Sequence, residues 1–200
     1  MSAPPQDRDW FIFLETGKKT PDDKARVAEM QRGHLENFKR LFGEKKLFAA
    51  GPLRDPSGVK RGIVVVKAPD RATLDAYFQP DEYVREGYMT LNATPVRVMK
   101  PLNAEGIDAN SIEEVRIVLA VRAGGRDDLA TRVRVSQAAE SDFFGASYHM
   151  QEGIYSDILF TREKDEAAIR IALGWGDTGN KGTGPAVVIW PQWLSKGVVR

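Results

Sequence analysis

The most regular pattern of hydrophobic and polar positions lies between Thr20 and Gly43. Residues spaced by three, four and seven positions fall on one face of an α-helix, and here they would form a single stripe. The members of this stripe are Val27, Met30, His34, Phe38 and Leu41. The pattern therefore predicts an amphipathic helix whose buried face carries a histidine.

The residues that flank this stripe indicate where the helix begins and ends. Thr20 can cap the helix with its side-chain oxygen, and Pro21 suits the first helical position. Asp22 and Asp23 favour the positive end of the helix dipole. Gly43 is a suitable stop. We therefore expect the helix to extend from Pro21 to about Gly43.

Other segments of the first half alternate or cluster apolar residues in the way typical of strands. The run from Trp10 to Leu14 is apolar at every position, which predicts a strand that is covered on both faces. A second helix is expected to begin at Pro69-Asp70, with Leu74, Tyr77 and Phe78 on its apolar side. The other predicted strands are Lys46 to Ala50, Arg61 to Ala68 and Thr94 to Lys100.

The expected order of strand, helix, strand, strand, helix, strand is that of a ferredoxin-like domain, and the second half repeats it. After a flexible arm at 1–8, the two domains are predicted at 9–101 and 111–200, joined by a linker. The strands expected in the second domain are Ile112 to Val121, Phe143 to Gln151, Ile154 to Thr161 and Ala186 to Leu194. Its helices are expected at Asp127 to Glu140 and Glu163 to Leu173.

Two such domains have a physical reason to pack together. A four-stranded sheet with helices on one face leaves its other face open, and two sheets placed face to face bury both. The prediction is an α+β protein: tandem ferredoxin-like domains that form a pseudo-dimeric α+β barrel with a cavity between the sheets. Because one chain supplies both halves, it can be a monomer, although further association stays open.

Composition and charge exclude several classes of function. The formal net charge is +1, with basic and acidic residues interspersed, so neither nucleic acid nor an anionic membrane is an expected partner. The chain has no cysteine, which removes disulfides, thiolate zinc sites and cysteine nucleophiles. A cytoplasmic location is the default expectation, and an exported mature chain is the alternative.

His34 has two interpretations on this evidence. It can be a core histidine that bonds a backbone carbonyl, or it can lie at the floor of a cavity, where its charge state could change near neutral pH. A chemical role becomes more specific when three later features are considered with it. These are Gly51-Pro52 after the second strand, Asp81 followed two residues later by Tyr83, and Gly87.

Together these residues give the segment from about 10 to 100 a pattern that resembles the YCII-related family. Members usually show Asp-Pro-Tyr, whereas this chain has Asp81-Glu82-Tyr83, with the proline ahead of the aspartate. The resemblance implies a dimeric α+β barrel in which a His-Asp pair lines a small pocket. His34 would then be the general base and Asp81 its orienting partner, with Gly51 and Pro52 in the pocket wall.

Several alternatives remain open beside that implication. Asp81 could instead cap a short helical turn at Glu82 to Glu86. The reaction expected from the resemblance is that of a lyase or isomerase acting on a small molecule without a cofactor. A non-catalytic ligand-binding or interaction module is the second hypothesis. An antibiotic-oxygenase-like enzyme is the third, and uptake of haem or flavin would favour it.

The second half offers weaker candidates. It has no histidine on its first predicted helix, so its pocket is expected to be degenerate. His149 lies on the more polar face of a predicted strand, where contact with solvent or a neighbouring strand is the favoured role. The glycines of 174–179 match G-x-G-x-x-G but follow a helix and precede a strand, so we interpret them as a loop. Two separate histidines give no metal spacing, and no metal site is predicted.

Overall fold

The structure is a computed structural model that describes residues 7–98, 100–123, 144–150, 154–172 and 186–199. The chain divides into two compact units, Met1–Pro95 and Val96–Arg200, which are described one at a time. Among the described residues, no helix has both the length and the apolar character needed to cross a membrane.

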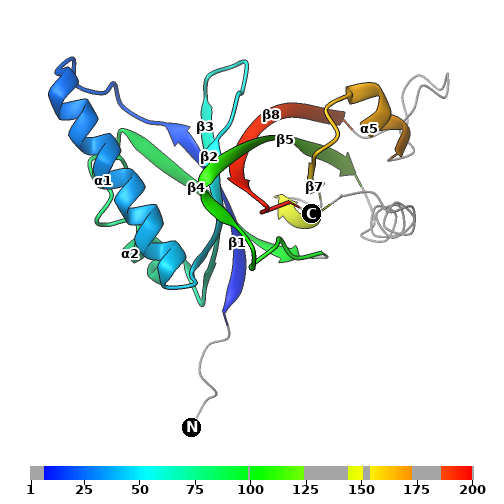
Figure 1. The fold of residues 1–200 in the computed structure, drawn as a ribbon, viewed down its shortest axis with the longest axis horizontal. Coiled ribbons are helices and arrows are strands. Elements are labelled where there is room, and N and C mark those ends of the chain that lie inside the picture. The colour runs from blue at the N-terminus through cyan, green and yellow to red at the C-terminus, as the bar shows by residue number, and fades with distance from the viewer. Residues whose placement is uncertain (1–6, 99, 124–143, 151–153, 173–185, 200) are drawn as a thin grey trace, which may run out of the picture. The chain divides into compact units, whose positions relative to one another are not determined.

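Unit 1 has the element order that the first half of the sequence predicts, with one short helix added (Figure 1). Its strands form a sheet in the order β2-β3-β1-β4, in which β3 is antiparallel to both β1 and β2. The strands are β1 (Arg8–Thr16), β2 (Leu47–Pro52), β3 (Lys60–Ala68) and β4 (Met89–Val98). The helices are α1 (Lys24–Gly43), α2 (Arg71–Tyr77) and α3 (Glu82–Arg85).

The predicted helix is present as α1, but its cap is not the expected one. Asp23 is the N-cap, and its Oδ1 accepts hydrogen bonds from the backbone N–H groups of Ala25 and Arg26 at 2.9 and 3.2 Å. The prediction that Thr20 caps the helix is therefore wrong, and α1 begins at Lys24. An aspartate can satisfy two of the free N–H groups at a helix start, which explains why it takes this position.

The C-terminal end of α1 also differs from the simple expectation of a glycine stop. Gly43 is the last helical residue, but Lys45 is the residue that adopts the left-handed conformation, with φ of 57°. The N–H of Lys46 donates to the carbonyl of Leu41 at 2.9 Å, and Lys45 donates to Phe42 at 3.0 Å. This is the hydrogen-bond pattern of a Schellman motif, which closes the helix.

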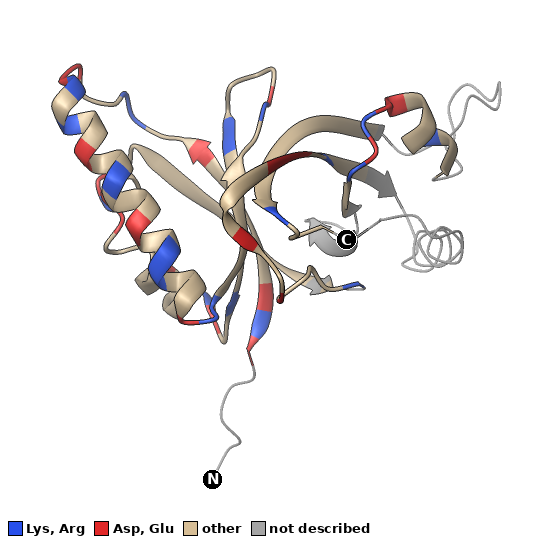
Figure 2. Cartoon of the chain, in the orientation of Figure 1, with Lys and Arg blue, Asp and Glu red and all other residues tan. Residues whose placement is uncertain are grey.

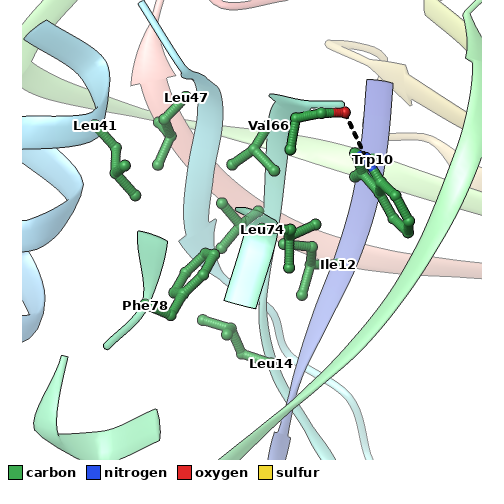
Figure 3. Close-up of a cluster of buried hydrophobic side chains, with 10 residues drawn as sticks. Trp10, Ile12, Leu14, Leu41, Leu47, Val66, Leu74 and Phe78 are labelled. Atoms are coloured by element: carbon green, nitrogen blue, oxygen red, sulfur yellow. Dashed lines mark hydrogen bonds between the residues drawn. The ribbon is translucent and has the colours of Figure 1, made fainter. Parts of the chain in front are cut away.

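The core of unit 1 lies between the helices and one face of the sheet (Figure 3). The indole Nε1 of Trp10 donates to the carbonyl of Ala68 at 3.0 Å, which satisfies the polar atom of a buried ring. The opposite face of β1 is also buried, with Phe11 and Phe13 at most 5% exposed, as its apolar run predicts. The cluster on the helix side contains Trp10, Ile12, Leu14, Leu41, Leu47, Val64, Val66, Ala68, Leu74 and Phe78.

The fourth strand begins earlier than the sequence pattern predicts. It starts at Met89, directly after Gly87 turns the chain with φ of 76°, rather than at Thr94. Met89, Leu91 and Ala93 alternate with polar residues and pack against the core cluster. This alternation is short and includes small residues, so it is weaker than the pattern of the other strands.

Unit 2 repeats the strand order of unit 1. Its sheet runs β6-β7-β5-β8, with each adjacent pair antiparallel, and residues 96–98 at the end of β4 pair with β6. The predicted helix at Asp127 to Glu140 and the glycines of 174–179 lie outside the described residues. The elements are β5 (Asp108–Ala123), β6 (Phe144–Met150), β7 (Ile154–Thr161), α5 (Glu166–Ala172) and β8 (Ala186–Lys196).

The expected linker between the halves has more structure than its composition indicates. Leu102 is buried, and the backbone N–H of Asn103 donates to the carbonyl of Val198 at 2.9 Å. β5 begins at Asp108, before the expected Ile112, because Asp108 still pairs with Lys196 of β8. The chain from 102 onward is therefore fixed to the end of the second sheet.

Candidate functional site

His34 and Asp81 are in direct contact, although 47 residues separate them in the sequence. Nδ1 of His34 lies 2.6 Å from Oδ2 of Asp81. The contact is buried, since His34 is 7% exposed and Asp81 is completely buried. The backbone-carbonyl interpretation of His34 is thus wrong, because its partner is a carboxylate.

The two interpretations of Asp81 turn out to be compatible, because each carboxylate oxygen has its own donor. Oδ1 accepts from the backbone N–H of Tyr83 at 3.0 Å, which makes Asp81 the N-cap of α3. Oδ2 faces His34. The cap fixes the rotation of the carboxylate, and that rotation directs Oδ2 at the imidazole. A carboxylate this deeply buried needs such partners to offset its lost hydration.

The contact with Asp81 bears on which nitrogen of His34 carries a proton. A carboxylate only accepts hydrogen bonds when it is ionised, and Nδ1 is then the donor to Asp81. When the ring is neutral, its lone pair is then on Nε2. No described residue forms a hydrogen bond with Nε2. Nε2 is thus the ring nitrogen available to a proton or a ligand.

Two aromatic rings surround the imidazole. The ring of Phe38 is 4.3 Å from that of His34, and the ring of Tyr83 is perpendicular to it at 5.7 Å. The Tyr83 hydroxyl donates to the carbonyl of Val27 at 3.4 Å. Burial raises the pKa of Tyr83; the charge of Arg61 opposes this effect and that of Asp81 adds to it. Tyr83 consequently stays protonated at neutral pH and acts as a donor.

Gly51 and Pro52, which the resemblance places in the pocket wall, end strand β2 and pair with Ile63 and Gly62 of β3. A Cβ on Gly62 would lie 2.9 Å from the carbonyl oxygen of Gly51, so the two strands approach closely here. In the described part of the chain neither Gly51 nor Pro52 has a polar contact with His34 or Asp81. Their role in a pocket stays a prediction.

Asp55 lies in the loop between β2 and β3, where its side chain stabilises a turn. Its carboxylate accepts from the backbone N–H and the hydroxyl of Ser57, at 2.9 and 2.5 Å, and from the N–H of Lys60 at 2.9 Å. Partial burial acts to raise the pKa of Asp55, but these hydrogen bonds outweigh it and lower the pKa below its usual value. Asp55 therefore stabilises the β2–β3 loop.

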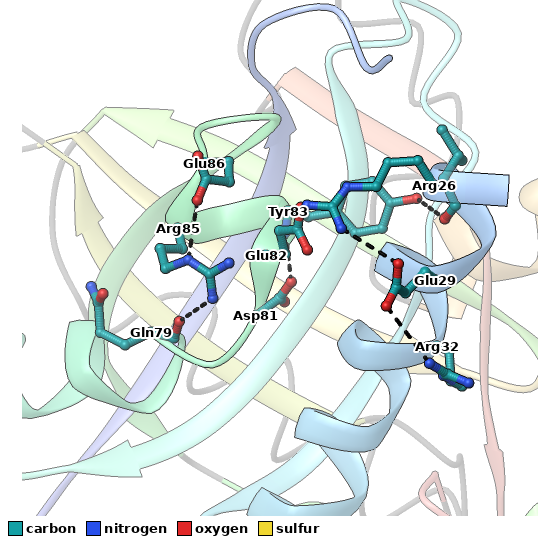
Figure 4. A network of polar contacts seen from close by, with 10 residues as sticks. Arg26, Glu29, Arg32, Gln79, Asp81, Glu82, Tyr83, Arg85 and Glu86 are labelled. Carbon is teal, nitrogen blue, oxygen red and sulfur yellow. Dashed lines mark hydrogen bonds and ion pairs between the residues drawn. The ribbon is translucent and has the colours of Figure 1, made fainter. Parts of the chain in front are cut away.

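Two polar residues near the pair, Asn37 and Glu82, have no signal in the sequence that marks their contacts. Asn37 is a buried polar residue on α1, and its side chain donates to the carbonyl of Tyr77 at 3.1 Å. Glu82 forms an ion pair with Arg26 of α1 (Figure 4). No periodic signal marks a pair separated by 56 positions, and the helical periodicity of α1 marks only its apolar face.

The other candidate features, His149, a metal site and a charged surface, give little evidence for a functional site. His149 lies in β6, but its side chain is outside the described part of the structure. Within the described residues, no three histidine, aspartate or glutamate side chains converge as a metal site would require. Charges along the outward side of α1 alternate in sign rather than forming a basic patch (Figure 2).

No protein-family model matches the sequence, and no curated protein matches it either. Solved structures do share its fold. A candidate monooxygenase from Lactobacillus acidophilus NCFM has a TM-score of 0.58 at 11% identity, covering 98% of this chain and 99% of that one. A candidate monooxygenase from Fusobacterium nucleatum subsp. nucleatum has a TM-score of 0.58 at 10% identity, covering 96% and 95%.

A mutant chlorite dismutase from Candidatus Nitrospira defluvii, in complex with cyanide, is also similar. Its TM-score is 0.56 at 11% identity, covering 93% of this chain and 90% of that one. Sequence identities this low establish a shared fold and no shared reaction. This chain therefore shares the fold of these three solved structures.

Proposed function

We propose that the chain is a small-molecule enzyme whose first chemical step is removal of a proton by Nε2 of His34. The observation that carries this proposal is the buried 2.6 Å contact of Asp81 with Nδ1, while Nε2 has no hydrogen-bond partner among the described residues. A carboxylate on Nδ1 fixes the tautomer and stabilises the imidazolium that forms when Nε2 takes a proton. His34 is the base in this proposal, and Asp81 is the residue that orients it.

Proton removal from carbon can lead to three outcomes. If a leaving group departs from the neighbouring carbon, the reaction is an elimination, and if the proton returns at another atom, it is an isomerisation. If the resulting carbanion reacts with O₂, it is an oxygenation. In that case one oxygen atom of O₂ converts a CH₂ group of the substrate to a carbonyl, and the other oxygen atom leaves as water. Four electrons pass from the substrate to O₂.

The structural neighbours favour oxygenation among these outcomes, because two of them are candidate monooxygenases. The lyase or isomerase reaction draws its support from the His34-Asp81 pair and from the resemblance to the YCII-related family. We also propose that the halves are tandem ferredoxin-like repeats, since both sheets have the same strand order. In this arrangement the first half carries the reactive pair, and the second supplies a degenerate site.

A panel of carbon acids tests the proposal without knowledge of the natural substrate. Suitable probes are a 1,3-diketone and an aryl ketone with an activated CH₂ group. Under nitrogen in D₂O, the wild-type chain should speed deuterium exchange, and His34→Ala should reduce this rate by about 100-fold or more. Oxygen uptake in air, seen with the wild type only, would identify the oxygenase reaction.

The control variant is Asn37→Ala, which also removes a buried polar side chain of α1 but one bonded to Tyr77 rather than to Asp81. It should keep the exchange rate of the wild type. Equal rates for His34→Ala and the wild type would refute the catalytic role of His34. Binding of a probe without exchange or oxygen uptake would favour a ligand-binding module.

A further inference from the structure

Asp81, Glu82 and Tyr83 are consecutive, and each side chain contacts α1. Figure 4 shows Glu82 and Tyr83 beside Arg26 of this helix. Three adjacent contacts with one helix are unusual for a segment of this length, because side chains of neighbouring residues normally diverge. α3 therefore faces α1 along its whole first turn. In chain order, the partners on α1 are His34, Arg26 and the carbonyl of Val27.

The contacts on α1 lie at two separated places. Arg26 and Val27 are in the first turn, and His34 is about 12 Å further along the axis, at 1.5 Å per residue. A single contact would leave α3 free to pivot about it. Two contacts at this separation fix both its position and its direction.

α3 needs such external support. It contains only four residues, Glu82–Arg85, and helices much shorter than about 12 residues are not stable by their own hydrogen bonds. The ion pair is suited to this role because Glu82 is largely shielded, with 17% of its side chain exposed, against 45% for Arg26. Partial shielding makes such a pair stronger than a fully exposed one.

We propose that Arg26 and Glu82 are positioning residues, whose ion pair holds α3 against α1 so that Oδ2 of Asp81 stays on Nδ1 of His34. This inference rests on the proposed function of the His34-Asp81 pair and adds a residue pair to it. Neither Arg26 nor Glu82 contacts the imidazole.

The proposal also accounts for the local sequence. Position 82 is where the YCII-related pattern has proline, a residue that fixes the backbone at the first position of a helix. In this chain Glu82 lacks that constraint, and the ion pair with Arg26 restrains the same backbone from outside. Asp81 has φ of −81° and ψ of 109°, an extended conformation close to the one a following proline favours.

The test is the exchange rate of the Nδ1 proton of His34 with water, followed by NMR on the full chain labelled with ¹⁵N in histidine. Arg26→Gln and Glu82→Gln should each speed this exchange by about fivefold. The double variant should add no further increase, because both single changes break the same pair. Urea unfolding of each variant separates this local effect from a general loss of stability.

Two further variants sharpen the result. Glu29→Gln removes the other ion pair of Arg26 and should leave the exchange rate unchanged. Glu82→Pro in the Arg26→Gln background should restore slow exchange, because proline replaces the lost restraint. No donor role of the Glu82 N–H is seen in the described residues, so proline removes no hydrogen bond there.

The proposal is overturned if Arg26→Gln and Glu82→Gln exchange at the wild-type rate, or if Glu29→Gln speeds exchange equally. In either case the proton can still lie on Nδ1 of His34. The proposed role of His34 as the base would then remain, and only the positioning role of Arg26 and Glu82 would be rejected. A proton on Nε2 instead would remove the proposed function itself, so the two failures are distinguishable.

Discussion

The Asp81 carboxylate contacts two hydrogen-bond donors at once. We therefore expect a substitution of Asp81 to disturb the site more than a substitution of any other residue in it. His34 Nδ1 is bonded to one oxygen and the Tyr83 N–H to the other. An asparagine has a single acceptor oxygen, so it can satisfy only one of these donors while keeping the same shape. The capping and orienting roles therefore cannot be separated by this change.

Asp81→Asn should lower the free energy of unfolding by about 2 kcal/mol, the usual cost of a buried donor left without an acceptor. Urea unfolding measures this change. Asp23→Asn is the matched control, since Asp23 is an exposed cap and asparagine caps a helix as well as aspartate. A loss in Asp23→Asn equal to that in Asp81→Asn would mean that capping alone accounts for the effect.

Asp55 provides a pH-dependent contribution in the β2–β3 loop. Its folded-state pKa is lowered, so the contribution to stability is present above the unfolded-state pKa of about 3.9 and is lost as pH falls through the folded-state value. The stability difference between wild type and Asp55→Ala should therefore be largest near neutral pH and shrink below about pH 4. A difference that is constant between pH 7 and pH 3 would contradict the hydrogen-bonded carboxylate.

At the scale of elements, the sequence predicts the existence of helices and strands better than their ends. The stripe of α1 is a long repeat, and its buried residues Met30, His34 and Leu41 follow it. The choice between Thr20 and Asp23 as the cap depends on the path of two or three residues, which several residue types could support. The start of β4 at Met89 has no clear signal, because the alternation of apolar and polar residues is weak there.

The cap of α1 can be tested directly. Asp23→Ala should lower the free energy of unfolding by about 1 kcal/mol, because two backbone N–H groups lose their acceptor. Thr20→Ala should change it by at most a few tenths of a kcal/mol. Urea unfolding of both variants measures these losses. A larger loss in Thr20→Ala than in Asp23→Ala would show that Thr20 is the cap.

Some residues of the site can be predicted from the sequence, and others cannot. His34 follows from periodicity, and Asp81 was found only because a family pattern marked it. The Arg26-Glu82 ion pair had no signal in the sequence, because tertiary packing alone brings these residues together. Long-range polar contacts of this kind depend on the path of α3, which no local pattern determines.

At the scale of the whole molecule, both halves have the same strand order, and the similar solved structures cover nearly the full chain. The histidine-carboxylate pair lies entirely within unit 1. This distribution agrees with the proposal of a tandem repeat with one reactive site per chain. Because one chain supplies both sheets, this proposal needs no second chain.

Sedimentation of the full chain tests that proposal. We expect a monomer of 22.3 kDa at micromolar concentration, because one chain supplies both sheets. An obligate dimer that unfolds on dilution would show that the open sheet faces are covered between chains instead.

The central claim is that His34 presents a free Nε2 because Asp81 holds the proton on Nδ1. The chain has only two histidines, so ¹⁵N spectra of the imidazole nitrogens can be assigned with a single His149→Gln variant. In the pH range where the ring is neutral, the spectrum should show the proton of His34 on Nδ1 and the lone pair on Nε2. A neutral ring with its proton on Nε2 would contradict the account.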